Sequence, residues 1–324
     1  MIGIYDKPMV RFLAAPVRVR VPATSANLGP GFDALGLALG LHDEVSARIS
    51  GVGIRVTVSG EGEGELPTDH DHLIVRCMLA TFDRLGDRPD GLELACHNNI
   101  PQARGLGSSS AAIVAGILAA RALVPDGARR MPDSEVLELA SEIEGHPDNV
   151  APCLLGGLTI AWIEDGRARA ARLEPDAGIR PTVVIPTDQG LTAHARAALP
   201  AEVPHRDAAL NAGRSALLIH ALTGAPELLM PATEDRLHQG YRAPAMPETA
   251  ELVRRFREAG MPAVVSGAGP SVLVFGTAEE ITKSEIPVTS GWRVMPLDVD
   301  ARGAVVGVDL QHAERDPVAA GRAS

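Results

Sequence analysis

The chain has 324 residues, of which 45% are hydrophobic, so it holds enough apolar material for one large domain or two medium ones. The formal net charge of −11 at pH 7 argues against the basic surface with which proteins bind nucleic acid or an anionic membrane. The three cysteines form no Cys-x-x-Cys pair, which disfavours a disulfide framework and a zinc site and fits a protein of the reducing cytoplasm.

The first part of the chain mixes predicted strands and helices. Residues 1–15 are charged and lack an uninterrupted apolar run, so they do not resemble a signal peptide. The most apolar segment, 111–124, is shorter than the about 20 residues that span a membrane.

Hydrophobic periodicity predicts a strand at 17–21, a loop rich in Gly, Asn and Pro, a strand pair at 44–49 and 54–58, helices at 73–85, 108–124 and 133–144, and strands at 92–96, 158–163, 168–173 and 181–186.

From about residue 187 the pattern changes, which predicts a second domain with its own sheet. Its predicted elements are helices at 192–199, 206–222 and 247–259 and strands at 263–265, 271–275 and 292–297. We therefore expect an α+β protein with a first domain at 1–186, a second at 187–310 and a frayed tail at 311–324. A ligand cleft is expected between the two domains.

Segment 101–111, between a predicted strand and a predicted helix, has the features of a phosphate-binding loop. Gly105 and Gly107 permit the backbone to approach an anion, and three serines bring hydroxyl and N–H groups to the first helical turn. A helix N-terminus, with its partial positive charge, favours a bound phosphate. The segment is not a Walker A loop, because the only lysines, Lys7 and Lys283, are far away in sequence. The alternative is that these residues merely cap an apolar core helix.

Three further loops, at 22–33, 144–150 and 266–271, concentrate polar or glycine residues. Each has a structural alternative: an ordinary turn, a helix stop signal followed by Pro, and a bulge between two apolar strands. Residues 68–72 have the spacing of a metal site, but Asp and His before a helix more often cap it.

In this order, the four loops resemble those of the GHMP small-molecule kinases, and among them the homoserine kinases. The matching strings are Pro22-Ala-Thr-Ser-Ala-Asn-Leu-Gly-Pro-Gly-Phe-Asp33, residues 101–111, Glu144-Gly-His-Pro-Asp-Asn-Val-Ala-Pro152 and Ser266-Gly-Ala-Gly-Pro-Ser271. The resemblance implies a dimeric two-domain α+β protein with an N-terminal mixed-sheet ATP-binding domain and a C-terminal ferredoxin-like domain. It also implies transfer of the γ-phosphoryl group of ATP, with Mg²⁺, to the hydroxyl of L-homoserine in threonine biosynthesis.

The resemblance further places the nucleotide and the metal. In these kinases the loop wraps the phosphates of ATP, and here it consists of Pro101, Gln102, Ala103, Arg104, Gly105, Leu106, Gly107, Ser108, Ser109, Ser110 and Ala111. A loop serine and a helix glutamate hold the metal; Ser109 and Glu138 match them, with Glu142 as the alternative. On the adenine side the chain departs from many relatives, because His72 stands where they have Asn.

For the amino acid, the resemblance implies a site around Asn27, Asp33, His146, Asp148 and Asn149, with Thr192, Arg196 and Arg242 in segments that grip the carboxylate. The chemistry agrees, because a zwitterion needs a carboxylate for its ammonium group and a guanidinium for its carboxylate. Asn149 is expected to hold the attacking hydroxyl. Asp148 is expected to position the substrate rather than to act as a base, because phosphoryl transfer mainly needs alignment and charge neutralisation.

Two other functions stay open at this point. One is a GHMP kinase that acts on a different small alcohol, which the strings at 22–33 and 144–152 disfavour. The other is a non-catalytic ligand-binding paralogue, which the intact serine run together with Glu138 and Asn149 disfavours.

Overall fold

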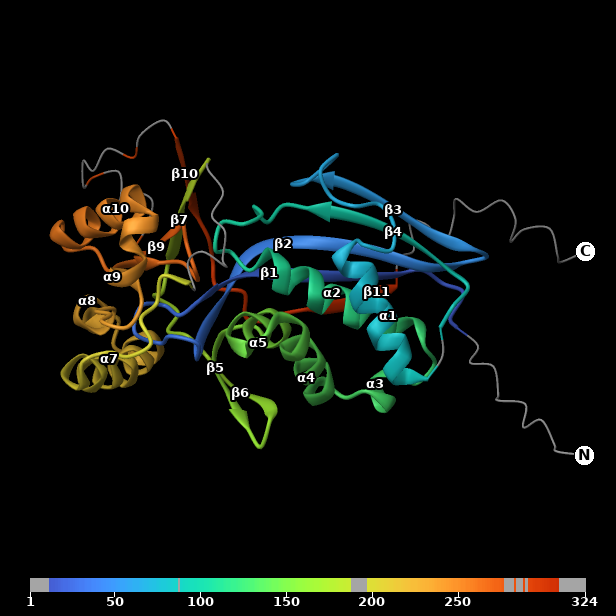
Figure 1. Ribbon diagram of the computed structural model, residues 1–324, viewed down its shortest axis with the longest axis horizontal. Helices are drawn as coiled ribbons and strands as arrows, with labels where there is room; N and C mark the ends of the chain where they lie inside the picture. Colours follow the sequence, from blue (N-terminus) through green and yellow to red (C-terminus); the bar gives the residue numbers. More distant parts are fainter. Residues whose placement is uncertain are drawn as a thin grey trace, which may run out of the picture.

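The computed structural model describes residues 12–86, 88–187, 197–276, 283, 288 and 291–308, and these form two sheets with helices packed on them (Figure 1). In this part of the chain the larger sheet has seven strands, in the order β11-β1-β2-β4-β3, with the β5–β6 hairpin attached to β2. Its strands are β1 (Val17–Ala26), β2 (Leu35–Ser50), β3 (Gly53–Gly60), β4 (Gly91–Asn98), β5 (Leu158–Glu164), β6 (Arg167–Leu173) and β11 (Val305–Val308).

The predicted strands at 44–49 and 54–58 both exist, but they are not neighbours in the sheet. Strand β4 lies between them, antiparallel to β2 and parallel to β3, so Gly91 faces Ser50 on one side and Gly53 on the other. A Cβ on Gly91 would come within 2.7 Å of the Gly53 carbonyl oxygen, so this crowded position suits glycine. Because parallel strands need a crossover, helix α1 (Leu73–Leu85) carries the chain from β3 to β4.

Helices cover one face of the larger sheet, as Figure 1 shows for α1, α2 (Ser108–Leu123), α4 (Asp133–Glu144) and α5 (Pro147–Leu155). Helix α2 is buried along most of its length because it packs on β1 and is flanked by the other three helices. Its run of alanines and branched apolar residues therefore belongs to the core of this part of the molecule. The short α3 (Gly127–Arg130) connects α2 to α4.

The smaller sheet has four described strands in the order β10-β7-β9-β8, all antiparallel. They are β7 (Pro181–Pro186), β8 (Ala263–Val265), β9 (Val272–Phe275) and β10 (Trp292–Pro296). Numbered within this sheet, the order is 4-1-3-2, which is the ferredoxin-like arrangement. Helix α10 (Pro247–Glu258) packs Leu252 and Phe256 on it, and α7 (His205–Gly224), α8 (Leu229–Ala232) and α9 (Gln239–Arg242) complete this part, with the single 3-10 turns Pro226–Leu228 and Ala243–Ala245.

The sheets divide the chain differently from the expected boundary after residue 186. Strand β7 belongs to the smaller sheet, and β11 returns to pair with β1 in the larger one. Apolar strand patterns do not reveal which sheet a strand joins, because that depends on distant partners. Residues 311–324 lie outside the described part of the chain. Among the described helices, none is long and apolar enough to cross a membrane.

Candidate active site

A cleft of about 610 Å³ is lined by residues of both parts of the molecule. It brings together most of the predicted site: Asn27, Asp33, Gln102, Ala103, Arg104, Gly105, Leu106, Gly107, Ser108, Ser109, Ala111, His146, Asp148, Asn149 and Arg242. Pro101 and Ser110 belong to the same loop and are buried. Segments that are far apart in the sequence therefore meet at one cleft, as a binding site requires.

The loop that leads into α2 runs close to its neighbours at two glycines. Gly105 and Gly107 both have φ of +70°, in the left-handed region that favours glycine. A Cβ on Gly105 would lie 2.2 Å from the carbonyl oxygen of Ser266, and one on Gly107 would lie 2.0 Å from the hydroxyl of Thr24. The course of the loop therefore depends on glycine at both positions.

Two side chains hold this loop against the rest of the molecule. Ser266 donates a hydrogen bond of 2.7 Å to the Gly105 carbonyl oxygen, and its hydroxyl oxygen lies 2.9 Å from the hydroxyl of Ser25, which can donate to it. Arg104 donates from Nε to the carbonyl oxygen of Pro186, at the end of β7, at 2.9 Å. The loop at 266–271 thus lies against the phosphate loop, and both parts of the molecule fix the phosphate loop.

A carboxylate lies beside the serines of the first turn of α2. Ser109 and Ser110 each donate a hydrogen bond of 2.8 Å to Oε1 of Glu144, the last residue of α4. Gly145, with φ of +93°, ends α4 as its C-cap, and this places Glu144 at the cleft. Hydroxyl and carboxylate oxygens are the ligands that Mg²⁺ prefers, so these three residues fit a magnesium site.

Helix α5 brings two further polar side chains to the cleft. Pro147 occupies the first helical position, where its missing N–H costs nothing, and Asp148 and Asn149 follow in the same turn. Asn149 accepts a hydrogen bond of 2.9 Å from the hydroxyl of Thr24, and Asp148, 2% exposed, lies 2.5 Å from Nδ1 of His146. Asn149 is therefore fixed from β1, and Asp148 is already engaged by a neighbouring imidazole.

At another wall of the cleft, the loop after β1 meets the second part of the molecule. Asn27 donates to the carbonyl oxygen of Gly267 at 2.9 Å and accepts from the backbone N–H of Asp33 at 2.9 Å. The buried guanidinium of Arg242 also approaches the Gly267 oxygen, at 3.4 Å. A carboxylate and a guanidinium thus line one cleft, which is the arrangement that recognises a zwitterion.

Comparison with known families agrees with this geometry. The model of the GHMP kinases N terminal domain matches residues 72–157, and the model of the GHMP kinases C terminal domain matches residues 209–284. A curated homoserine kinase of Streptomyces coelicolor is 58% identical over 295 residues, which cover 91% of this chain and 96% of the relative. The chain belongs to the homoserine kinase family of the GHMP kinases.

Other members of the family agree over similar lengths. The homoserine kinase of Clavibacter michiganensis is 51% identical over 90% of this chain and 94% of its own length. The crystal structure of a homoserine kinase from Cytophaga hutchinsonii has a TM-score of 0.77 and 27% identity, covering 94% of this chain and all of that one. A mevalonate diphosphate decarboxylase of Staphylococcus aureus, at 15% identity and a TM-score of 0.63, shares the fold alone.

Within this family framework, the structure does not bring the predicted glutamate to Ser109. Glu138 lies 3.9 Å from Nε of Arg167 in strand β6, and the alternative, Glu142, forms an ion pair of 2.5 Å with Arg84. The six residues from Glu138 to Glu144 turn the side chain by about 240° and advance it by about 9 Å along the helix. The glutamate that contacts Ser109 in this structure is therefore Glu144, and the assignment of the metal to Ser109 with Glu138 or Glu142 stays a prediction.

Two predicted substrate residues, Thr192 and Arg196, lie outside the described residues. His72, the departure on the adenine side, lines the cleft just before α1 and is only 3% exposed. Neither of its ring nitrogens has a hydrogen-bond partner among the described residues, and burial lowers the pKa of its imidazole. The ring is therefore neutral and offers one donor and one acceptor beside the cleft.

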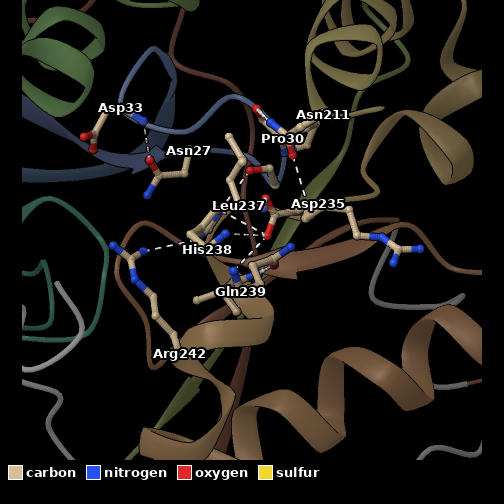
Figure 2. A network of polar contacts seen from close by, with 12 residues as sticks. Asn27, Pro30, Asp33, Asn211, Asp235, Leu237, His238, Gln239 and Arg242 are labelled. Carbon is tan, nitrogen blue, oxygen red and sulfur yellow. Dashed lines mark hydrogen bonds and ion pairs between the residues drawn. The ribbon is translucent and has the colours of Figure 1, made fainter. Parts of the chain in front are cut away.

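The structure also contains a polar network that sequence reasoning missed (Figure 2). His238 is fully buried and contacts both Arg242 and the carbonyl oxygen of Gly29. Asn211 of α7 donates to the carbonyl oxygen of Pro30 at 2.7 Å, so the loop after β1 is held from two sides. The available signal was the four-residue spacing of His238 and Arg242, which places two residues on one helical face.

Proposed function

We propose that this protein is a homoserine kinase, which transfers the γ-phosphoryl group of ATP to the hydroxyl of L-homoserine and releases O-phospho-L-homoserine and ADP, as a step of threonine biosynthesis. The observation that carries the proposal is the composition of the cleft that the phosphate loop lines. A phosphate loop with Ser109 and Glu144 lines it together with Asn149 and with the carboxylate and guanidinium of Asp33 and Arg242. Such a cleft can hold a nucleoside triphosphate and an amino acid at the same time.

The phosphate loop provides charge neutralisation. Residues 102–107 of the loop and Ser108 and Ser109 at the N-terminus of α2 line the cleft, where backbone N–H groups would favour the negative charge that spreads over the transferred group. Ser109 and Glu144, with Ser110 behind them, are the residues that would hold Mg²⁺. When bound, the metal neutralises charge on the β- and γ-phosphates.

The other side of the cleft orients the acceptor. Asp33, with its backbone fixed by Asn27, binds the ammonium group, and Arg242 binds the carboxylate together with Thr192 and Arg196. The side-chain carbonyl oxygen of Asn149 accepts the hydrogen bond from Thr24, so its amide NH₂ group points away from Thr24 and can donate to the substrate hydroxyl. The hydroxyl is thereby directed toward the phosphates.

No strong base is required in this proposal. Asp148 is buried against His146, so it orients that imidazole and the start of α5 at the cleft rather than taking the hydroxyl proton. A loose transition state asks mainly for alignment and charge neutralisation, which the loop and Asn149 provide. On the nucleotide side, His72, which is buried and has no hydrogen-bond partner among the described residues, contacts the base.

The test is a coupled ADP-release assay with homoserine, threonine, serine, mevalonate and galactose as acceptors. The proposal expects homoserine to have the largest kcat/KM and the ADP signal to require Mg²⁺. A larger value for mevalonate or galactose would favour a GHMP kinase for another alcohol, and binding without turnover would favour a ligand-binding paralogue. The proposal includes a cytoplasmic homodimer, and light scattering of the purified protein measures its mass.

A further inference from the structure

His238 uses both ring nitrogens on groups that flank the substrate region of the cleft (Figure 2). Its Nε2 lies 2.8 Å from the carbonyl oxygen of Gly29, in the loop that carries Asn27 and Asp33. Its Nδ1 lies 3.1 Å from Nη1 of Arg242. One fully buried imidazole therefore joins the loop on one side of the substrate to the guanidinium on the other.

The two partners fix the protonation state of the ring. A backbone carbonyl oxygen only accepts hydrogen bonds, so Nε2 must carry the proton that His238 donates to Gly29. A guanidinium only donates, so Nδ1 must offer its lone pair to Arg242. The contacts are satisfied together only by the neutral Nε2–H tautomer, and an imidazolium would set an N–H and a positive charge against Arg242.

The surroundings support this neutral ring. Burial and the positive charge of Arg242 lower the pKa of His238, against the opposing charges of Asp235 and Asp33 and the Gly29 hydrogen bond. Asp235 lies 3.8 Å from Nε2, but its carboxylate accepts the backbone N–H groups of Leu237, His238 and Gln239. These acidic groups therefore face the ring without replacing its two partners.

Phe32 completes the enclosure of the two side chains. Its ring stacks on the His238 imidazole with centroids 5.2 Å apart, and the Arg242 guanidinium lies over the same ring at 5.5 Å. A cation over an aromatic face is attracted by the π electrons, so Phe32 also favours this position of Arg242.

We propose that His238 is a positioning residue for substrate recognition: as the neutral Nε2–H tautomer it aims the Arg242 guanidinium at the substrate carboxylate and holds the loop that carries Asn27 and Asp33. This inference rests on the proposed function, because it takes Arg242 as the carboxylate ligand. It makes homoserine affinity, rather than ATP affinity, depend on a residue that does not line the cleft.

Two isosteric variants separate the two contacts of the ring. In His238→Asn the amide oxygen takes the place of Nδ1, whereas in His238→Gln the amide NH₂ group reaches toward Gly29 and no acceptor stands at Nδ1. We expect His238→Gln to raise the KM for homoserine about tenfold or more, with the KM for ATP unchanged, and His238→Asn to raise it much less. His220→Gln, on the exposed face of α7, is the matched control and should behave as the wild type.

A truncated substrate and a double variant test the route through Arg242. 3-Aminopropan-1-ol is homoserine without its carboxylate, so its kcat/KM should be the same in the wild type and in His238→Gln. Adding His238→Gln to Arg242→Ala should cause little further loss, because one interaction is removed by either change. Acidification should raise the KM for homoserine in the wild type, as the ring takes up a proton, but not in His238→Asn.

The outcomes distinguish the two proposals. If Arg242→Ala leaves the preference for homoserine over 3-aminopropan-1-ol unchanged, the assigned carboxylate site fails, and the proposed function is judged separately by the acceptor panel. If Arg242→Ala removes that preference but both His238 variants keep it, or if the losses in the double variant add, His238 has no positioning role. If His238→Gln does not fold, the pH profile of His238→Asn against the wild type decides, and identical profiles overturn the inference.

Discussion

The hydroxyl of Ser109 donates a hydrogen bond of 2.8 Å to the carboxylate of Glu144, and this bond joins the first turn of α2 to the end of α4 at the wall of the cleft. Ser110 donates to the same oxygen. The carboxylate and the two hydroxyl groups form a set of hard oxygen ligands beside the phosphate loop, and such a set suits a magnesium ion.

We therefore predict that Glu144→Gln lowers kcat by about 100-fold or more, because an amide cannot replace the charge that the metal requires. Ser109→Ala should act in the same direction, and both should raise the Mg²⁺ concentration needed for half-maximal rate. Glu138→Gln, on the same helix, is the matched control and should keep wild-type Mg²⁺ dependence. The assignment to Glu144 is overturned if the Glu138 variant, correctly folded by thermal melting, shows the altered dependence instead.

The contact between Ser109 and Glu144 shows how far the sequence determines the site. The helix at 133–144 is predicted with the correct bounds, because its apolar spacing and the Gly145 stop signal are local. Which of its glutamates meets Ser109 depends on how α4 packs on α2, and that packing is set by residues far apart in sequence. The motif therefore indicates a glutamate of α4, whereas the packing brings Glu144 rather than Glu138 into contact with Ser109.

The sequence analysis also did not predict helix α5 and strand β11, because their local signals are ambiguous. Pro147 after Gly145 predicts the end of a helix, but proline is equally suited to the first position of the next one, and α5 begins there. Strand β11 is short and gains its structure from pairing with β1, almost 300 residues earlier. The role of His238 likewise depends on its contacts with Gly29 and Arg242. Sequence spacing indicates only the contact with Arg242, because Gly29 is far away in the sequence.

Substrate discrimination should fail in a charge-specific way. If Arg242 binds the substrate carboxylate, Arg242→Ala should lower kcat/KM for homoserine about tenfold or more and reduce its preference over 3-aminopropan-1-ol. Asp33→Asn should instead reduce the preference for homoserine over 4-hydroxybutanoate, which lacks the ammonium group. Arg196→Ala should resemble Arg242→Ala, and each end serves as the control for the other. If all three variants prefer homoserine over both analogues as strongly as the wild type does, the amino acid binds outside the assigned site.

Asp148 gives a prediction about the pH profile of the reaction. Because it is buried against His146 and assigned to positioning, Asp148→Asn should retain measurable phosphoryl transfer. Its kcat profile should keep any basic limb that the wild type shows. A variant that binds homoserine and ATP normally but does not turn over would reinstate Asp148 as the general base. Binding is measured by calorimetry with each ligand alone.

His72 should affect the nucleotide and not the amino acid. Its buried ring has no partner among the described residues, so a base bound beside it would satisfy a polar group that is otherwise costly to bury. His72→Phe should raise the KM for ATP about tenfold with little change in the KM for homoserine. His72→Asn should keep most of the affinity, and His70→Asn, at an exposed position nearby, is the control. Equal ATP affinity in His72→Phe and the wild type would contradict the contact.

Asp43 connects the acid–base behaviour of the protein to the phosphate loop. Its carboxylate in β2 accepts the backbone N–H groups of Asn99 and Ile100, at 2.7 and 2.9 Å, directly before the loop begins. Burial raises the pKa of this carboxyl from 3.8 to about 6 despite those two hydrogen bonds. The folded protein therefore holds a proton on Asp43 at pH values at which the unfolded chain has lost it.

We predict that this proton makes the free energy of unfolding fall as pH rises. The contribution of Asp43 is fully present below the unfolded pKa of 3.8 and is lost as pH rises through the folded pKa of about 6. The loss amounts to about 3 kcal/mol, since each pKa unit corresponds to about 1.4 kcal/mol. Asp43→Asn keeps an acceptor oxygen but does not titrate, so its stability relative to the wild type should increase between pH 4 and pH 7. Urea unfolding at both pH values measures this difference, and parallel stability profiles of variant and wild type would show that Asp43 is ionised in the folded state throughout this range.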